Sequence, residues 1–115
     1  SGYGKHYKEI GKKFGPVDLV FMDSGQYNVR WKAVHNMPNE VITGFKDLKG
    51  KNLVPIHWGM FTLAMHNWYE PPVEIKRRAE EQDISLITPI IGQVVDMKNL
   101  QKSENWWEKL INKIK

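Results

Sequence analysis

Four histidines are the residues of this sequence best suited to metal or proton chemistry. They are His6, His35, His57 and His66. No two of them have the His-x-His or His-x3-His spacing that is typical of a complete metal site. His57 stands apart because it directly follows the apolar run 53–56. Since buried strands deliver side chains to a site at their C-terminal ends, His57 could bind a metal or transfer a proton. A histidine that only caps or fills a core is the alternative.

The other histidines differ in what surrounds them. His35 lies in the stretch 26–37, which has no clean periodicity and is expected to be a long loop, so it could face His57 across a site. His66 could line the same cleft or simply pack, and His6 lies in a lysine-rich stretch where solvation is expected. The sequence contains neither a glycine-rich phosphate loop nor a Gly-x-Ser-x-Gly nucleophile motif. Taken by themselves, these residues indicate half of a site.

Helix and strand patterns alternate along the chain, which indicates an α/β fold. The expected helices cover residues 5–14, 38–50, 71–82 and 103–115, with Ser103 as the cap of the last, and the expected strands cover 17–22, 52–56, 84–91 and 93–95. The strands 17–22 and 52–56 are both followed by polar residues. Their ends could therefore converge on one site.

Composition narrows the class of protein. A chain of 115 residues with 41% hydrophobic residues is expected to form a single domain, 1–115. It contains no cysteine, which excludes disulfides and thiolate metal sites and is compatible with a cytoplasmic location. The net charge of +4 is modest and its basic residues form no single tract, so no nucleic-acid partner is expected.

The last expected helix is amphipathic. Its apolar stripe is Trp106, Trp107, Leu110, Ile111 and Ile114, with lysines between these positions. A basic helix with tryptophans can lie on a membrane surface. Such a stripe more often covers the edge of its own domain, and we expect that arrangement here rather than membrane attachment.

A set of segments in a specific order carries a resemblance to a known family. They are Ser1-Gly2-Tyr3, the block 7–19, Gly25-Gln26-Tyr27, Arg30-Trp31, the block 35–40, the block 55–59, Leu63-Ala64 and Glu70-Pro71-Pro72. Through these segments, residues 1–95 resemble the C-terminal half of metallo-β-lactamase-fold hydrolases. The similarity is greatest to the branch that holds N-acyl-phosphatidylethanolamine-hydrolysing phospholipase D and the ascorbate-6-phosphate lactonase-like proteins.

The resemblance implies a fold. The complete family fold is a four-layer αβ/βα sandwich, and this chain would supply about half of it, a mixed sheet with helices on one face. The other face of the sheet would normally be buried against the N-terminal half of the same protein. That half is therefore an expected partner, and without it the exposed apolar face should lead the chain to self-associate.

The resemblance also implies the chemistry of a zinc-dependent hydrolase. In this family a Gly-Asp-Ser/Thr-Gly turn supplies an aspartate that bridges two zinc ions, and Ser1-Gly2 matches the end of that turn. The aspartate and a His-x-His-x-Asp-His motif would then precede residue 1. A metal-bound hydroxide would attack a phosphodiester or a lactone-type ester of a small or lipid-like substrate.

The family's roles carry over to four residues. His57 matches the last metal ligand, and His35 matches a catalytic position that lines the cleft. Gln26 and Tyr27 match the mouth of the cleft, where they would bind substrate. Because only one metal ligand carries over, the isolated chain is expected to be inactive.

Two departures from the family pattern weaken the lipid assignment. Asp23-Ser24 replaces a Pro-Ile pair of the phospholipase relatives, and Tyr69 stands where many members have an aspartate. Both positions are expected near the substrate mouth, so a generic metal-dependent hydrolase is the better-founded reading. The alternative from another functional class is a non-catalytic α/β module that binds an anion or a partner protein.

Overall fold

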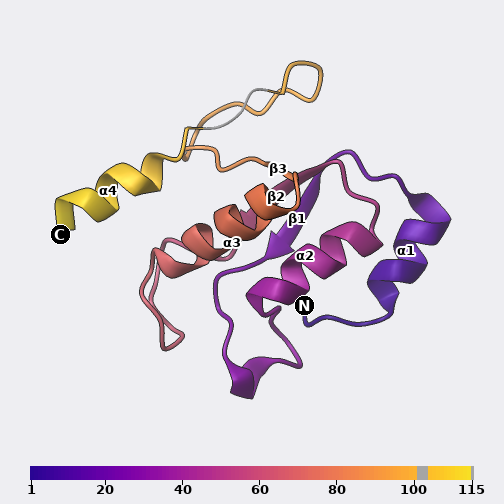
Figure 1. The fold of residues 1–115 in the computed structure, drawn as a ribbon, viewed down its shortest axis with the longest axis horizontal. Helices are drawn as coiled ribbons and strands as arrows, with labels where there is room; N and C mark the ends of the chain where they lie inside the picture. Colours follow the sequence, from indigo (N-terminus) through magenta and orange to yellow (C-terminus); the bar gives the residue numbers. More distant parts are fainter. Residues whose placement is uncertain (101–103, 115) are drawn as a thin grey trace.

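The computed structural model describes residues 1–100 and 104–114 (Figure 1). Its elements in chain order are α1 (His6–Phe14), β1 (Val20–Asp23), the 3-10 helix η1 (Val29–Trp31), α2 (Pro38–Asp47), β2 (Asn52–Ile56), α3 (Glu70–Glu81), β3 (Ser85–Leu86) and α4 (Trp106–Ile114). This alternation confirms the α/β class. The expected cap of the last helix, Ser103, lies outside the described residues.

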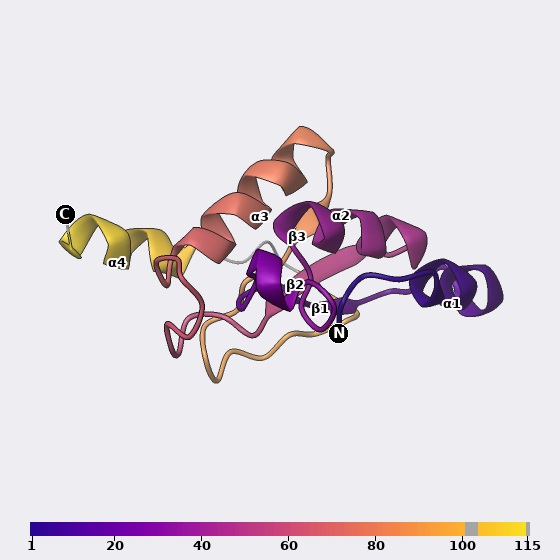
Figure 2. The ribbon, with the colours of Figure 1, turned by 90° about the horizontal axis from the view of Figure 1, so that it is seen from below.

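The three described strands form one parallel sheet in the order β1-β2-β3. Val20 pairs with Leu53 and Asp23 pairs with Ile56, while β3 pairs with the other edge of β2. Parallel neighbours need a long crossover, and α2 and α3 supply it. Figure 2 shows both helices on the same side of the strands, as expected. The expectation of a mixed sheet is wrong for the described strands, because every pairing among them is parallel.

The predicted strands at 84–91 and 93–95 are largely wrong. Only Ser85–Leu86 forms a strand, and no strand is assigned among the described residues after it. The last bond to β2 is the one that the Ile87 amide donates to the Leu53 carbonyl, and Pro89 has no amide hydrogen to continue the ladder. Ile90 and Ile91 are exposed. The apolar run therefore predicted a longer strand than the ladder beside β2 allows, because pairing stops before Pro89.

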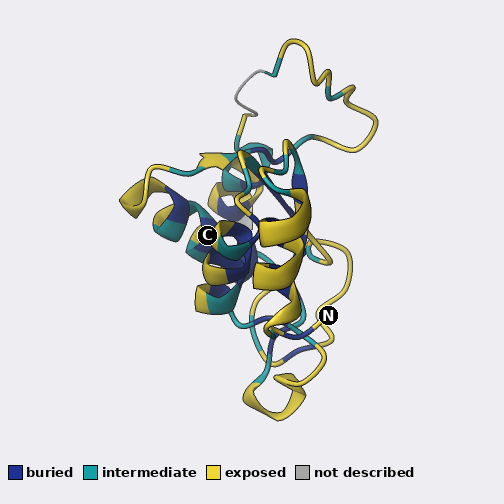
Figure 3. Cartoon of the chain, turned by 90° about the vertical axis from the view of Figure 1, so that its right-hand side faces the viewer, coloured by how far each residue is buried: buried dark blue, intermediate teal, exposed yellow. Residues whose placement is uncertain are grey.

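The core lies between the sheet and α2, and Figure 3 shows the buried stretches inside the molecule with exposed stretches around them. Val20 and Met22 point to this side of the sheet and are at most 4% exposed. The buried cluster is Tyr7, Val20, Met22, Val41, Ile42, Phe45, Leu48, Leu53 and Ile75. α2 begins with Pro38 in its first turn, and the Glu40 carboxylate accepts a hydrogen bond from the Met37 amide at 2.9 Å. This packing holds β1 and β2 in place, and with them the polar residues at their C-terminal ends.

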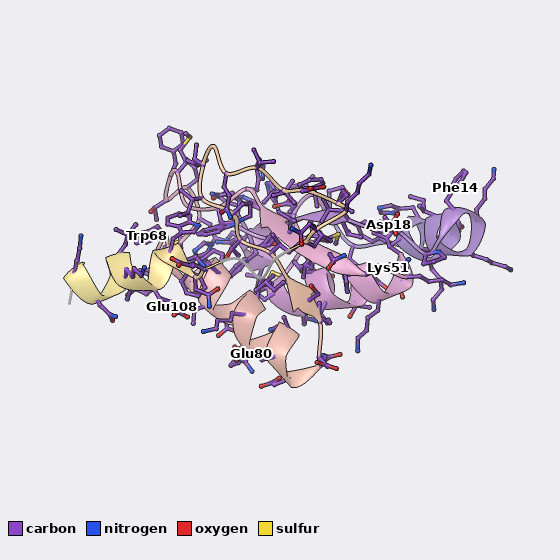
Figure 4. The ribbon with its side chains drawn as sticks, turned by 90° about the horizontal axis from the view of Figure 1, so that it is seen from above. Phe14, Asp18, Lys51, Trp68, Glu80 and Glu108 are labelled. Atoms are coloured by element: carbon purple, nitrogen blue, oxygen red, sulfur yellow. The ribbon has the colours of Figure 1, made fainter. Side chains whose placement is uncertain are left out.

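The opposite face of the sheet is only partly covered. Phe21 and Ile56 lie on it, and they are 60% and 41% exposed. At the far end of this sheet Asp18 and Lys51 form an exposed ion pair of 3.2 Å, and Figure 4 shows the two side chains together. This face therefore exposes apolar side chains, although Val54, which pairs with Phe21, is 5% exposed.

The terminal helix α4 packs against its own domain. Trp107 is 1% exposed, and the Trp106 ring stacks on the Trp58 ring with centroids 5.6 Å apart. Glu108 of α4 pairs with Lys76 of α3. The expectation that this apolar stripe packs on its own domain is confirmed for the two tryptophans. Among the described residues, no helix combines the length and apolar character needed to span a bilayer.

Candidate metal and catalytic site

Three side chains meet where β1 and β2 end. The Nδ1 atom of His35 lies 2.6 Å from Oδ2 of Asp23, and the Nδ1 atom of His57 lies 3.3 Å from Oδ1 of the same carboxylate. One donor atom from each residue falls within 4.8 Å of the others. The structure thus brings together the two histidines that the sequence singled out, and it adds Asp23.

The polar residues after the strands 17–22 and 52–56 were expected to converge on one site, but no metal or catalytic role was predicted for Asp23. Its position is fixed by register: it pairs with Ile56, so His57, the first residue after β2, must leave the sheet beside it. The Asp23 side chain is only 10% exposed, and its Oδ1 atom has no hydrogen-bond partner among the described residues. A buried carboxylate oxygen without a partner is costly. Two imidazoles and a carboxylate also form the kind of nitrogen and oxygen donor set that zinc accepts.

The backbone of His57 is held in an unusual conformation. Its φ angle is 71°, in the left-handed region that residues other than glycine rarely adopt. Gly25 makes this possible, because a Cβ atom at Gly25 would lie 1.8 Å from the His57 carbonyl oxygen. Strained backbone of this kind persists only where the surroundings enforce it, and it is often found at functional sites.

Gln26, in the loop after β1, forms hydrogen bonds with the backbone of the loop after β2. Its amide nitrogen donates to the carbonyls of His57 at 3.4 Å and Phe61 at 3.2 Å, and its amide oxygen accepts from the Ala64 amide at 3.1 Å. Gln26 also lines the cavity described below. The structure therefore places this expected substrate-binding residue at the cavity, with its polar atoms engaged by backbone.

Tyr27 was expected at the mouth of the cleft, but the structure places it elsewhere. Its side chain is buried, 8% exposed, and its ring stacks on His66 with centroids 4.3 Å apart. Burial, and next the carboxylates of Glu70 and Glu74, raise the pKa of its phenol. Tyr27 is absent from the cavity lining because its ring points into the packing beneath the loop. The same stacking resolves the two alternatives for His66 in favour of packing.

A cavity of about 620 Å³ opens beside the two site histidines. Its lining is Gln26, Trp31, Val34, His35, His57, Trp58, Met60, Phe61 and Leu63. Most of these side chains are apolar, so two imidazoles face a largely hydrophobic space. A few polar groups set in an apolar cavity are typical of sites that bind small molecules.

The start of the described chain also reaches the site. The backbone nitrogen of Ser1 lies 3.7 Å from Oδ2 of Asp23. Ser1 is anchored through its hydroxyl, which lies 3.1 Å from the Tyr7 hydroxyl, and Asn36 donates to that same tyrosine oxygen at 3.3 Å. Any residue joined to Ser1 on its amino side would therefore lie close to the three site side chains.

Several known proteins are similar to this chain over different shares of its length. An uncharacterised protein of Mycobacterium tuberculosis is 36% identical over 110 residues, which cover 93% of this chain and 30% of that protein. The outer membrane protein RomA of Klebsiella pneumoniae is 49% identical over 59 residues, or 51% of this chain and 45% of that protein. The N-acyl-phosphatidylethanolamine-hydrolyzing phospholipase D 1 of Caenorhabditis elegans is 33% identical over 95 residues, or 76% of this chain and 27% of that protein.

The chain thus spans about 30% of the length of the mycobacterial relative. A family model described as the beta-lactamase superfamily domain matches residues 1–58, which is half of the chain and includes Asp23, His35 and His57. The match ends one residue after His57, so the site lies entirely within it. The chain belongs to the beta-lactamase superfamily.

Proposed function

We propose that residues 1–115 are the C-terminal portion of a zinc-dependent hydrolase domain that cleaves a phosphodiester or a lactone-type ester. One observation carries the proposal: His57, His35 and Asp23 converge beside an apolar cavity in a chain of this superfamily. A relative from Caenorhabditis elegans is named for hydrolysing N-acyl-phosphatidylethanolamine. That name supports an ester substrate with apolar groups, either a small molecule or a lipid-like one.

His57 is the residue of this chain that would hold zinc. Its side chain is 60% exposed, so its imidazole remains accessible at the edge of the cavity. A bound zinc ion supplies Lewis acidity toward water and toward an ester or phosphoryl oxygen. The remaining ligands would come from chain on the amino side of Ser1, whose backbone nitrogen already lies at the site.

His35 is the proposed proton carrier. Because its Nδ1 atom is engaged by Asp23, its Nε2 atom is the nitrogen left to exchange a proton with substrate. In the protonated imidazole, Nε2 would donate its hydrogen to the leaving-group oxygen as the ester bond breaks. Water supplies the oxygen that replaces this leaving group on the acyl or phosphoryl group, and His35 is left neutral; in a lactone both ends of the broken bond stay in one molecule.

The cavity wall would hold the apolar part of the substrate. Trp31, Val34 and Phe61 lie on this wall with the two histidines. Gln26 contributes by fixing the wall in place through its bonds to the backbone of Phe61 and Ala64. In this proposal Tyr27 supports the loop from beneath and does not contact the substrate.

The open sheet face suggests the partner. Phe21 and Ile56 expose apolar surface there, and the chain covers only about 30% of the mycobacterial relative. We propose that the N-terminal part of the same protein covers this face, completing a four-layer sandwich. Expressed alone, the chain should self-associate, and light scattering would detect it. A monodisperse monomer at all concentrations would contradict this part of the proposal.

The hydrolase itself is tested with the product of the complete reading frame. We expect it to contain zinc by elemental analysis and to hydrolyse bis(p-nitrophenyl) phosphate or δ-valerolactone. His57→Ala should lower both zinc content and hydrolysis, the latter by about 100-fold or more. His6→Ala, on the exposed surface of α1, is the matched control and should change neither. Full hydrolysis by His57→Ala would contradict the proposal, and a protein that binds anions without hydrolysing them would favour the binding-module alternative.

A further inference from the structure

We infer that Asp23 is a positioning residue that holds both site histidines in a single tautomer, with Nδ1 protonated and Nε2 free toward the cavity. The inference concerns a role that the sequence did not assign to Asp23. It deepens the proposed function and rests on it for its consequence in hydrolysis. The tautomers themselves depend only on the contacts among Asp23, His35 and His57.

The contact with His35 is the stronger of the two. The distance of 2.6 Å between His35 Nδ1 and Asp23 Oδ2 is that of a short, charge-assisted hydrogen bond. An ionised carboxylate can only accept, so the hydrogen must be on Nδ1. In the neutral imidazole the lone pair is then on Nε2.

The contact with His57 completes the arrangement. Asp23 Oδ1 is buried without a hydrogen-bond partner, and His57 Nδ1 lies 3.3 Å away. The His57 side chain is 60% exposed, so its ring is free to turn slightly and align an Nδ1 hydrogen with Oδ1. The cost of an unpaired buried oxygen favours this alignment. One carboxylate would then serve two imidazoles, one on each oxygen.

The consequence is two Nε2 lone pairs presented at the cavity. A carboxylate that accepts from the second ring nitrogen of a metal-binding histidine fixes the tautomer and raises the basicity of the ligand. Asp23 would do this for His57 as ligand and for His35 as proton carrier at once. The competing arrangement has Asp23 and the two Nδ1 atoms bind a metal directly, and it requires Nδ1 to carry no hydrogen.

The inferred tautomers of the metal-free chain are tested by long-range 1H–15N NMR of the histidine rings. The sample is the metal-free 115-residue chain at a pH where imidazoles are neutral. The spectrum shows which ring nitrogen carries the hydrogen. We expect Nδ1–H for both His35 and His57, whereas exposed His6 should show the Nε2–H form that free imidazole side chains favour in water. Nε2–H at His35 or His57 in the folded chain would overturn the inference without any variant.

Variants give a graded test. Asp23→Ala should return both histidines to Nε2–H, and Asp23→Asn should leave Nδ1–H at one of them at most, because its amide offers a single acceptor oxygen. Asp18→Ala, at the exposed far end of the sheet (Figure 4), is the control and should leave both rings as Nδ1–H. Retention of Nδ1–H at both rings in a folded Asp23→Ala chain would refute the positioning role.

A second readout uses the complete protein. There Asp23→Ala should weaken zinc affinity by about 10- to 100-fold, while Asp18→Ala should leave it unchanged. Because the tautomers are measured without metal, a protein that fails to hydrolyse esters but shows two Nδ1–H rings would refute the proposed function and leave the inference standing. A protein that hydrolyses esters but lacks Nδ1–H at either ring would refute only the inference.

Discussion

The loops that follow β1 and β2 build the same site in opposite ways. In the start of the loop after β1, residues 24–27 (the first loop), Ser24 is fully buried and the Tyr27 side chain is 8% exposed. In the second loop, residues 57–65, Phe61 is 66% exposed and Met65 is 92% exposed. The first loop belongs to the core, whereas the second lies on the surface beside the cavity.

The difference shows which loop positions the other. The second loop contributes His57, but its conformation depends on close contact with Gly25 and on the amide of Gln26. The residue that we propose as the metal ligand is on an exposed loop and is therefore placed by a buried neighbour. Substitutions in the first loop should have larger effects than substitutions in the second, and the following predictions test this in order of expected size.

Gly25→Ala should have the largest effect. The new methyl group would lie 1.8 Å from the His57 carbonyl oxygen, so the two loops must separate. We expect the free energy of unfolding in urea to fall by about 3 kcal/mol. Gly59→Ala is the control. The φ angle of Gly59 is +84°, but a Cβ atom there would meet no other atom within 4 Å, so the substitution should cost only about 1 kcal/mol. Equal losses in the two variants would contradict the account of how the loops fit together.

Gln26→Ala should cost about 1–2 kcal/mol, because it removes hydrogen bonds to the backbone of the second loop. Hydrogen exchange at the Ala64 amide is the sharper measurement. This amide donates to the Gln26 oxygen, so it should lose protection in Gln26→Ala. It should keep most of its protection in Gln26→Glu, which retains an acceptor. Unchanged protection in Gln26→Ala would show that the bond does not hold the loop in solution.

Tyr27→Phe should change how the free energy of unfolding depends on pH, because the Tyr27 phenol is buried in the first loop. Burial, then Glu70 and Glu74, raise the pKa of the phenol above its ordinary value of about 10, so the folded state favours the neutral form. This stabilisation is present below pH about 10 and is lost as the pH rises toward the folded pKa. The free energy of unfolding of the parent chain should fall relative to Tyr27→Phe by at most about 1.4 kcal/mol per pH unit above pH 10.

Near neutral pH the same substitution should change stability by less than about 1 kcal/mol, because the Tyr27 hydroxyl has no hydrogen-bond partner among the described residues. Urea unfolding of both proteins across the alkaline range provides the measurement. Parallel pH profiles would mean that the phenol is solvated in the folded chain.

Met65→Ser should have the smallest effect. Its side chain is 92% exposed in the second loop, so little apolar burial is lost. We expect the free energy of unfolding to change by less than about 0.5 kcal/mol. A loss above 1 kcal/mol would mean that this loop is buried in solution and that the contrast between the loops is wrong.

The two loops also show what the sequence could predict. The strand before His57 was predicted with its observed bounds, because its apolar run has a paired neighbour on each side. The strand-end rule singled out His57, and the position of His35 in a long loop allowed it to face His57, where the structure places it. Asp23 was missed because its place depends on the register of β1 against β2, which residue types alone do not encode. The strands predicted at 84–91 and 93–95 were mostly wrong because Pro89 has no amide hydrogen to continue the ladder beside β2, and no described strand pairs with the residues that follow it.

The central claim is that His57, His35 and Asp23 form part of a zinc site that chain on the amino side of Ser1 completes. The most direct measurement is the sequence of the coding DNA upstream of the Ser1 codon. The account predicts a Gly-Asp pair immediately before Ser1 and a His-x-His-x-Asp-His motif farther upstream. An upstream reading frame that lacks these ligands would contradict it, and His57 would then lie in a site that cannot bind two zinc ions.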